Sequence, residues 1–313
     1  MADVVFNKLA VIGLGLIGSS VVRASRAYGL ARTVAVADAN EAVLARVREL
    51  GIADLVASDL AEAVADADAV ILCVPVGESG PATRAIAPHL KQGAIISDVG
   101  SVKSAVIEAV EPVLPDHAFF VPAHPVAGTE FSGPDAGFSE LFQNRWCILT
   151  PSSRSTEDAV ARMRSLWEGF GARVEAMDAR HHDLVLAITS HVPHLIAYNI
   201  VGTAADLEQV TQSEVMKFSA GGFRDFTRIA SSDPTMWRDV FLNNRDAVLE
   251  MLGRFTEDLA SLQRMVRYGD GDGLFDLFTR TRAIRRGIIA QGQETAAPDF
   301  GRRPDPAAIK SES

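Results

Sequence analysis

The sequence predicts an α/β domain at the N-terminus followed by an all-helical domain, on three observations. Short apolar runs typical of strands alternate with helical runs from Lys8 onward, as in a parallel sheet covered by helices. A glycine-rich turn joins the first strand to the first helix. After Met177 only long apolar stretches at helical spacing follow. We therefore expect domains at residues 1–178 and 179–290, and a disordered tail at residues 291–313.

Length and composition are those of a globular protein of two domains. At 313 residues the chain is long for one core, and 48% apolar and 22% charged residues are ordinary values. The net charge of −10 argues against nucleic acid or an anionic membrane as a partner, and no apolar run reaches the roughly 20 residues of a membrane span. Cys73 and Cys147 lie in apolar runs, which predicts buried thiols and a cytoplasmic protein.

The first strand, Lys8–Ile12, runs directly into a glycine pattern that opens the helix Ser19–Tyr28. In a dinucleotide-binding turn the first glycine permits the tight bend, the second lets the backbone approach a pyrophosphate, and the third allows close packing of helix on strand. The helix N-terminus then offers free N–H groups to the phosphates. The pattern predicts that the cofactor contacts Gly13, Leu14, Gly15, Leu16, Ile17 and Gly18.

The second strand, Thr33–Ala37, ends in Asp38, twenty residues after the last of these glycines. A carboxylate here accepts hydrogen bonds from the ribose hydroxyls and repels a 2′-phosphate. No arginine follows, because the next residues are Ala39 and Asn40. A Rossmann-type domain that binds NAD rather than NADP is therefore expected.

The alternation continues to the end of this domain. Val74 and Pro75 end one of its strands, where the backbone can pass over the cofactor, and both are predicted to bind it. Helices are expected at Ala42–Leu50, Ala61–Ala67, Pro81–Leu90 and Thr156–Phe170, with another ending at Val113, and strands at Ala69–Val74, Ala94–Ser97, Phe119–Val121, Trp146–Thr150 and Arg173–Ala176.

The second domain is predicted to be helical throughout. Ala179–Asp206 has helical spacing and should kink at Pro193. Pro234–Arg267 reads as one long helix capped by Asp233, and Asp272–Ile289 as another. Because long helices with apolar faces must bury them, we expect the chain to form a homodimer.

Two clusters carry side chains suited to chemistry. His124 follows the predicted strand Phe119–Val121 at the edge of the sheet where ligands bind, and Pro125 holds it in extended backbone. His191 and His194 share a helix face; that spacing suits a metal pair, but no third ligand lies nearby, so no metal is expected. An anionic substrate approaching a chain of net charge −10 needs such a local group of cationic side chains.

Five stretches in order resemble the prephenate/arogenate dehydrogenases (cyclohexadienyl dehydrogenases) of tyrosine biosynthesis. The likeness extends from about Lys8 to Ile289. It implies NAD-dependent oxidative decarboxylation, which converts prephenate to 4-hydroxyphenylpyruvate or arogenate to tyrosine. The stretches are Gly13-Leu14-Gly15-Leu16-Ile17-Gly18-Ser19, Asp98-Val99-Gly100-Ser101-Val102-Lys103, His124-Pro125-Val126-Ala127-Gly128, Ser190-His191-Val192-Pro193-His194 and Gly222-Phe223-Arg224-Asp225-Phe226-Thr227-Arg228-Ile229-Ala230.

The resemblance assigns roles, each with a plainer alternative. His124 would take the proton of the substrate hydroxyl, rather than only satisfy backbone groups. Ser101 would cap its helix and also orient His124 or the substrate, beside the cofactor. His194, supported by His191, would bind the side-chain carboxylate, and Arg228 would clamp a carboxylate; the alternatives are core histidines and a solvated helix. The remaining candidates for the substrate site are Thr129, Glu130, Gly222, Arg224, Asp225 and Trp237, the last reaching a neighbouring subunit or packing in the core.

Two other functions stay open at this point. A β-hydroxyacid dehydrogenase or imine reductase would use a lysine of the helical domain, and Lys217 is the sole lysine between Lys103 and Lys310. A regulator that senses NAD without turnover would not need the histidines and Arg228 together. The choice between prephenate and arogenate also stays open, with Gln212 and Glu214 as the suspects.

Overall fold

The structure is a computed structural model that describes residues 4–129, 131–211 and 220–290. Glu130, Gln212, Glu214 and Lys217, singled out in the sequence, lie outside the described residues. The chain divides into two compact units, Met1–Leu252 and Gly253–Ser313, and each is described by itself.

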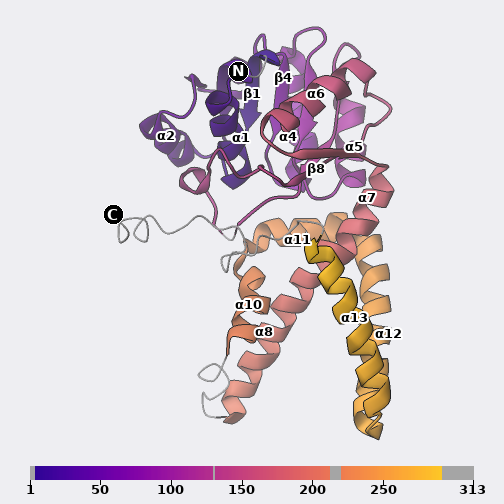
Figure 1. Ribbon diagram of the computed structural model, residues 1–313. Coiled ribbons are helices and arrows are strands. Elements are labelled where there is room, and N and C mark those ends of the chain that lie inside the picture. Colours follow the sequence, from indigo (N-terminus) through magenta and orange to yellow (C-terminus); the bar gives the residue numbers. More distant parts are fainter. Residues whose placement is uncertain (1–3, 130, 212–219, 291–313) are drawn as a thin grey trace. The chain divides into compact units, whose positions relative to one another are not determined.

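A parallel sheet of six strands forms the centre of the larger unit (Figure 1). Its order, β3-β2-β1-β4-β5-β6, is that of a doubly wound Rossmann sheet, with the topological switch between β1 and β4. The predicted α/β class is confirmed. The pattern missed the two-residue strand β3, which is too short to show alternation. The strands are β1 Phe6–Ile12, β2 Ala31–Ala37, β3 Leu55–Val56, β4 Ala69–Leu72, β5 Ile95–Asp98 and β6 Phe119–Phe120.

The central strands are apolar on both faces because helices cover both. Along β1, Leu9 and Val11 belong to one hydrophobic core, while Ala10 and Ile12 belong to a second core on the opposite face. The first core includes residues of α1 and α6, and the second includes residues of α3, α4 and α5. The helices are α1 Leu16–Ala27, α2 Glu41–Leu50, α3 Leu60–Val64, α4 Ser79–Ile86, α5 Ser104–Val110 and α6 Glu157–Gly169.

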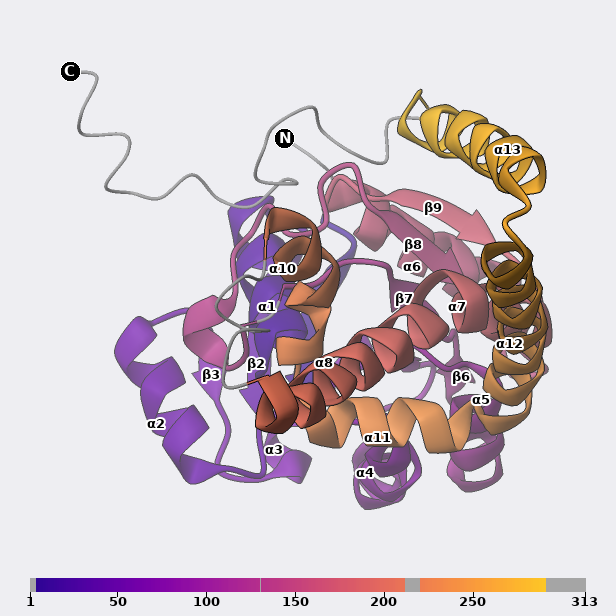
Figure 2. The ribbon, with the colours of Figure 1, turned by 90° about the horizontal axis from the view of Figure 1, so that it is seen from below.

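A second, three-stranded sheet follows, with β7 Ala123–Pro125 antiparallel to β8 Trp146–Leu149, and β8 parallel to β9 Arg173–Ala176 (Figure 2). The prediction that His124 closes the strand Phe119–Val121 is therefore wrong. His124 lies in the middle of β7, opposite Ile148, because the chain leaves the first sheet after Phe120 and pairs again with a different strand.

The first helical stretch after the sheets contains a π-helical turn. Helix α7, Ala179–Leu186, leads through the turn η5, Ala187–His191, into α8, Val192–Thr211. This π-helical turn lies just before Pro193, whose ring crowds the carbonyl four residues earlier and whose nitrogen donates no hydrogen bond. Residues 179–207 contain an 18-residue window of mean hydropathy 1.5, so this stretch is long and apolar enough to cross a membrane, a test that core helices of soluble proteins also pass.

The predicted helix Pro234–Arg267 is two helices. Helix α11, Pro234–Asn243, begins at the predicted cap Asp233, whose carboxylate accepts from the backbone of Met236, and it ends at Asn244. Helix α12, Arg245–Tyr268, then starts in a new direction (Figure 1). Before them lie α10, Gly221–Thr227, and the short 3₁₀ turn η6, Arg228–Ser231.

The smaller unit contains the end of α12 and helix α13, Gly271–Ala290, joined through Gly269 at φ +68°. Asp270 accepts a hydrogen bond from the backbone of Gly273 and so caps α13. Large apolar side chains are exposed along both helices: Leu259, Val266, Tyr268, Phe275, Phe278, Ile284 and Ile288.

Candidate active site

The glycine turn after β1 has the geometry of a phosphate-binding loop. Gly13 has φ +91°, and a Cβ there would overlap the carbonyl of Cys73; a Cβ on Gly18 would overlap the carbonyl of Gly13. Gly15 faces open space. Helix α1 starts at Leu16, earlier than predicted, and no side chain caps its N-terminus. Its first N–H groups are therefore available to an anion.

The other cofactor candidates gather around this loop. The carboxylate of Asp38 accepts from the backbone N–H of Leu14 at 2.7 Å, so it lies directly beside the loop. Val74 and Pro75 follow β4, the strand next to β1, and Val74 lies against Gly13. An uncapped helix end, an open glycine and a neighbouring carboxylate fit NAD.

His124 is 7% exposed and ends a buried chain of hydrogen bonds. Its Nδ1 lies 2.8 Å from Nε2 of His182, and Nδ1 of His182 lies 2.9 Å from Oδ1 of Asp183. Burial lowers the pKa of His124 well below 6.5, and the nearby charges of His182, Lys103 and His191 lower it further. His124 is therefore neutral at neutral pH, as a proton acceptor must be.

Asp183 joins this chain to the first turn of α5. Its carboxylate accepts from the backbone N–H groups of Lys103 at 2.7 Å and Ser104 at 2.9 Å. Burial alone would raise the pKa of Asp183, but the hydrogen bonds from His182 and Ser104 hold it below its ordinary value. The prediction that Ser101 caps α5 is therefore wrong. The carboxylate of Asp183, from helix α7, binds the first N–H groups of α5 instead.

A buried ion pair fixes the strand that carries His124. The ammonium of Lys103 contacts the carboxylate of Asp98 and donates to the carbonyl of Ala123 at 2.7 Å. Both charged side chains are almost completely buried. Burial lowers the pKa of Lys103, against the pull of Asp98. Because Asp98 ends β5, the pair ties β7 to the main sheet.

His191 is held by Asn244. The side-chain nitrogen of Asn244 lies 3.1 Å from Nδ1 of His191 and donates to the backbone carbonyl of Asp183 at 2.8 Å. Because the amide nitrogen is a donor, Nδ1 of His191 accepts, and Nε2 carries the hydrogen. Burial lowers the pKa of His191 to about 4. The backbone of Ser101 lies beside this ring, which brings the loop after β5 to the helical segment.

His194 and Trp237 form a stacked pair, with ring centroids 3.6 Å apart and an angle of 25° between the planes. Nδ1 of His194 donates to the carbonyl of Ser190 at 2.8 Å. Burial and then the charge of Arg228 lower the pKa of His194. Trp237 is 6% exposed and is packed within its own chain.

The remaining candidates are only partly brought together. Arg228 is half-buried and close enough to His194 to influence its pKa, whereas Gly222, Arg224 and Asp225 are exposed on α10. Thr129 is half-buried, and its hydroxyl accepts from the backbone of Phe131. Across residues 4–129, 131–211 and 220–290, no three His, Cys, Asp or Glu side chains are grouped to hold a metal ion.

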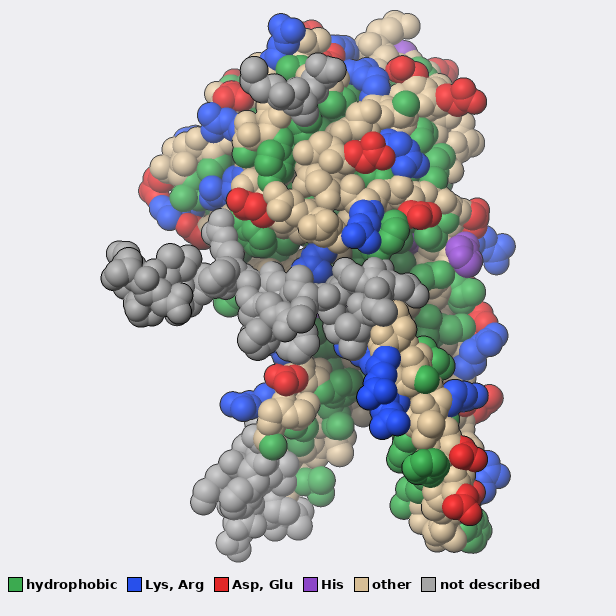
Figure 3. Space-filling view, viewed as in Figure 1, with side chains coloured by type: hydrophobic (Ala, Val, Ile, Leu, Met, Phe, Trp, Pro, Cys, Tyr) green, Lys and Arg blue, Asp and Glu red, His purple; other side chains and the backbone are tan. Residues whose placement is uncertain are grey.

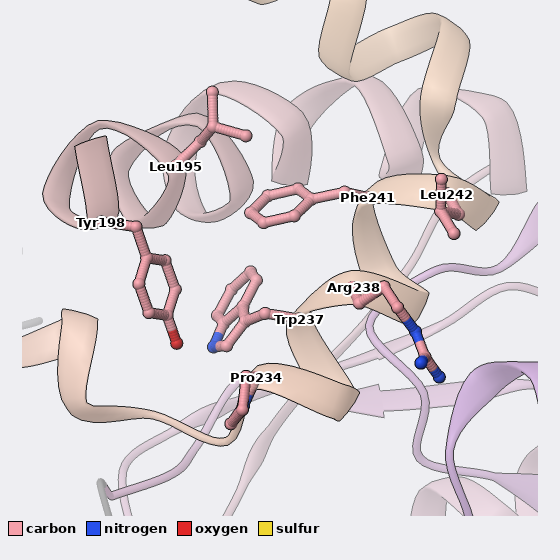
Figure 4. Close-up of a pocket in the computed structure, with 7 residues that line it drawn as sticks. All are labelled: Leu195, Tyr198, Pro234, Trp237, Arg238, Phe241 and Leu242. Atoms are coloured by element: carbon pink, nitrogen blue, oxygen red, sulfur yellow. The ribbon is translucent and has the colours of Figure 1, made fainter. Parts of the chain in front are cut away.

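Trp237 also lines an apolar groove of about 460 Å³ between α8 and α11. Figure 4 shows its indole beside the rings of Tyr198 and Phe241. The groove lies next to the histidine cluster but contains none of its residues. Its lining is Leu195, Tyr198, Pro234, Trp237, Arg238, Phe241 and Leu242.

Sequence reasoning missed His182, Asp183 and Asn244. The adjacent pair of His182 and Asp183 in an apolar helix was a visible signal, because a buried carboxylate needs partners. Asn244, a poor helix former inside a predicted long helix, marked the break. Neither feature of the sequence predicts which groups these side chains contact in the folded chain.

A Rossmann fold with a neutral, oriented histidine near its strand ends defines a nicotinamide-dependent dehydrogenase. Two family models match the chain: residues 21–176 match the nucleotide-binding domain of prephenate dehydrogenase, and residues 178–280 match its dimerization domain. The chain belongs to the prephenate dehydrogenase family, which confirms the resemblance and the use of NAD. It is an NAD-dependent dehydrogenase of tyrosine biosynthesis.

Known proteins resemble it along most of its length. A cyclohexadienyl dehydrogenase of Zymomonas mobilis is 46% identical, covering 90% of this chain and 96% of the relative. A prephenate dehydrogenase of Bacillus subtilis is 33% identical, covering 94% and 79%. The crystal structure of prephenate dehydrogenase from A. aeolicus with hydroxyphenyl propionate and NAD⁺ has a TM-score of 0.84 at 29% identity, covering 90% and 98%.

Proposed function

We propose that the chain catalyses the oxidative decarboxylation of both prephenate and arogenate, with His124 as the base. The hydroxyl proton passes to Nε2 of His124, and the hydride leaves the carbon that bears the hydroxyl, which becomes a carbonyl. The ring carboxylate leaves as carbon dioxide, its bonding pair makes the ring aromatic, and the resulting phenolate oxygen takes the proton back from His124. NAD, when bound, supplies the hydride acceptor. The observation that supports this assignment is the hydrogen-bond chain from Asp183 to His124, which leaves a lone pair on Nε2.

Ser101 and the cofactor loop complete the reacting centre in this proposal. Ser101 follows β5 beside His191 and can orient the substrate hydroxyl. The glycine turn and Asp38 hold NAD at the strand ends. Both lie at the carboxyl edge of the same parallel sheet, where open α/β sheets bind their ligands.

Arg228 and His194 would bind the two carboxylates. A guanidinium offers two parallel donors to a carboxylate. His194 already donates through Nδ1, so it can donate to a carboxylate from Nε2 only when protonated, and a bound anion favours that form. If Arg228 holds the ring carboxylate, it stabilises a group that must lose its charge, so it contributes more to binding than to chemistry.

The use of both substrates is supported by the similarity to the cyclohexadienyl dehydrogenase. The test is NADH absorbance with the purified chain, offered prephenate or arogenate with NAD and then with NADP. We expect turnover of both substrates with NAD and weaker turnover with NADP. Turnover of one substrate alone would contradict the proposed use of both, and no turnover with either would refute the proposed reaction.

We further propose that the chain is a cytoplasmic homodimer, associating through residues 179–290. The smaller unit exposes seven large apolar side chains on α12 and α13, and hydrophobic side chains are visible along these helices in Figure 3. The match to a dimerization domain supports the same conclusion. Light scattering on the eluting protein should give twice the mass of the 33.5 kDa chain, and a monomer would contradict it.

A further inference from the structure

We propose that His182 and Asp183 are positioning residues for His124, and that the positive charge created by taking the substrate proton comes to rest on His182. This inference rests on the proposed role of His124 as the base. It is carried by the geometry of three buried side chains, exposed by 7%, 0% and 5% for His124, His182 and Asp183.

The direction of each hydrogen bond in the chain follows from Asp183. Its carboxylate accepts from the backbone of Lys103 and Ser104 at the start of α5, where the helix dipole also favours a negative charge. An ionised carboxylate can only accept, so Nδ1 of His182 carries a hydrogen. Nε2 of neutral His182 then accepts from Nδ1 of His124. The lone pair of His124 is therefore held on Nε2.

The charges around the two rings differ. Burial and the ammonium of Lys103 disfavour a positive charge on either ring, but no carboxylate is hydrogen-bonded to His124. The same charge on His182 lies 2.9 Å from the carboxylate of Asp183. Opposite charges at that separation attract strongly in a buried site. The second arrangement is the more favourable one.

The proton transfer balances without a further reactant. The hydroxyl proton moves to Nε2 of His124, and the hydrogen on Nδ1 of His124 moves to Nε2 of His182. His182 keeps the hydrogen on its own Nδ1, which still donates to the carboxylate of Asp183. The electron pair of the former O–H bond becomes the second bond of the new carbonyl as the hydride leaves. His124 ends neutral, with its Nε2–H donating to that carbonyl oxygen.

Asp183→Asn tests the proposal in the full-length chain. An amide can donate to Nδ1 of His182 and so reverse both hydrogen bonds, leaving His124 without an accepting Nε2. We expect kcat to fall at least about 100-fold with KM changed less than about threefold. The acid limb of the kcat–pH profile should move to lower pH, because no carboxylate stabilises protonated His182.

The matched control is Asp178→Asn. Asp178 caps α7 by accepting from the backbone of Arg180 and His181, and it is exposed and outside the hydrogen-bond chain. Its variant should keep the helix cap, because the Asn amide oxygen still accepts from the backbone, and should keep the wild-type kcat and acid limb. Equal effects of the two variants on kcat, or an unmoved acid limb in Asp183→Asn, would overturn the proposal.

A second measurement does not need turnover. Two-bond ¹H–¹⁵N correlation spectra of the wild-type chain, with the histidines labelled, report which ring nitrogen carries the hydrogen. We expect His124 and His182 to be neutral with hydrogen on Nδ1, assigned through His→Gln variants. Hydrogen on Nε2 of His182 would refute the inference. An inactive wild type would instead refute the proposed function while leaving this result interpretable.

Discussion

The two histidine pairs of this chain use the same side chain for different chemistry. In the pair of His124 and His182, the last partner is the carboxylate of Asp183, and the outer nitrogen of His124 accepts. In the pair of His191 and His194, the partners on Nδ1 are an amide donor and a backbone carbonyl. The group bound at Nδ1, not the residue type, decides whether Nε2 accepts or donates.

His191 donates from Nε2, whereas neutral His194 accepts there as His124 does, so the surroundings of the rings must distinguish a base from binding groups. The first pair lies between β7 and α7, and burial lowers the pKa of His124, as the proposed role of a base requires. The second pair lies against Trp237, and one member is influenced by the charge of Arg228. Substitutions in the first pair should therefore change kcat, and substitutions around the second should change KM or stability.

The largest effect is expected for His124→Asn. An amide cannot take the hydroxyl proton, so kcat should fall about 10²–10⁴-fold with little change in KM. The measurement is steady-state NADH formation with saturating NAD. His117→Asn, which removes an exposed histidine, is the control. A loss of less than tenfold in kcat would remove His124 from the role of base.

The second pair should make stability depend on pH. The pKa of His191 is about 4 in the folded chain and about 6.5 when unfolded. Between pH 6.5 and about 4, His191 is protonated in the unfolded chain but stays neutral in the folded chain. The free energy of unfolding therefore decreases as the pH falls through this range. The full loss is about 3 kcal/mol from this residue. Denaturant unfolding of wild type and His191→Gln across this range should show a flatter dependence in the variant; parallel curves would contradict it.

Arg228→Ala should raise KM about 10- to 100-fold and change kcat less, because the guanidinium binds substrate and transition state alike. Arg224→Ala, four residues earlier and exposed, should raise KM less. Steady-state kinetics with prephenate distinguishes them. A main effect on kcat in Arg228→Ala would reverse the roles assigned to Arg228 and His124.

The comparison also shows what the sequence could predict. The glycine turn and Asp38 were predictable because neighbouring residues in the chain build that site, and the strand–turn–helix context is local. The hydrogen bond between His124 and His182 joins residues 58 positions apart, and His124 lies in a strand pairing that the pattern did not reveal. Ser101 was assigned as a cap from its position, but a cap supplied by another helix leaves no local signal.

The smallest effect is expected for Asn244→Ala, and it tests the connection between the two pairs. The amide of Asn244 contacts both the carbonyl of Asp183 and the ring of His191, in buried surroundings. Its loss leaves Nδ1 of His191 without this donor, while the carbonyl of Asp183 keeps the backbone N–H of Ala187, and should cost about 1–3 kcal/mol of unfolding free energy. Asn243→Ala, which removes an exposed amide bonded to the carbonyl of Asp239, should cost less. If denaturant titrations gave equal losses, the break between α11 and α12 would not depend on this contact, and the two histidine pairs would act independently.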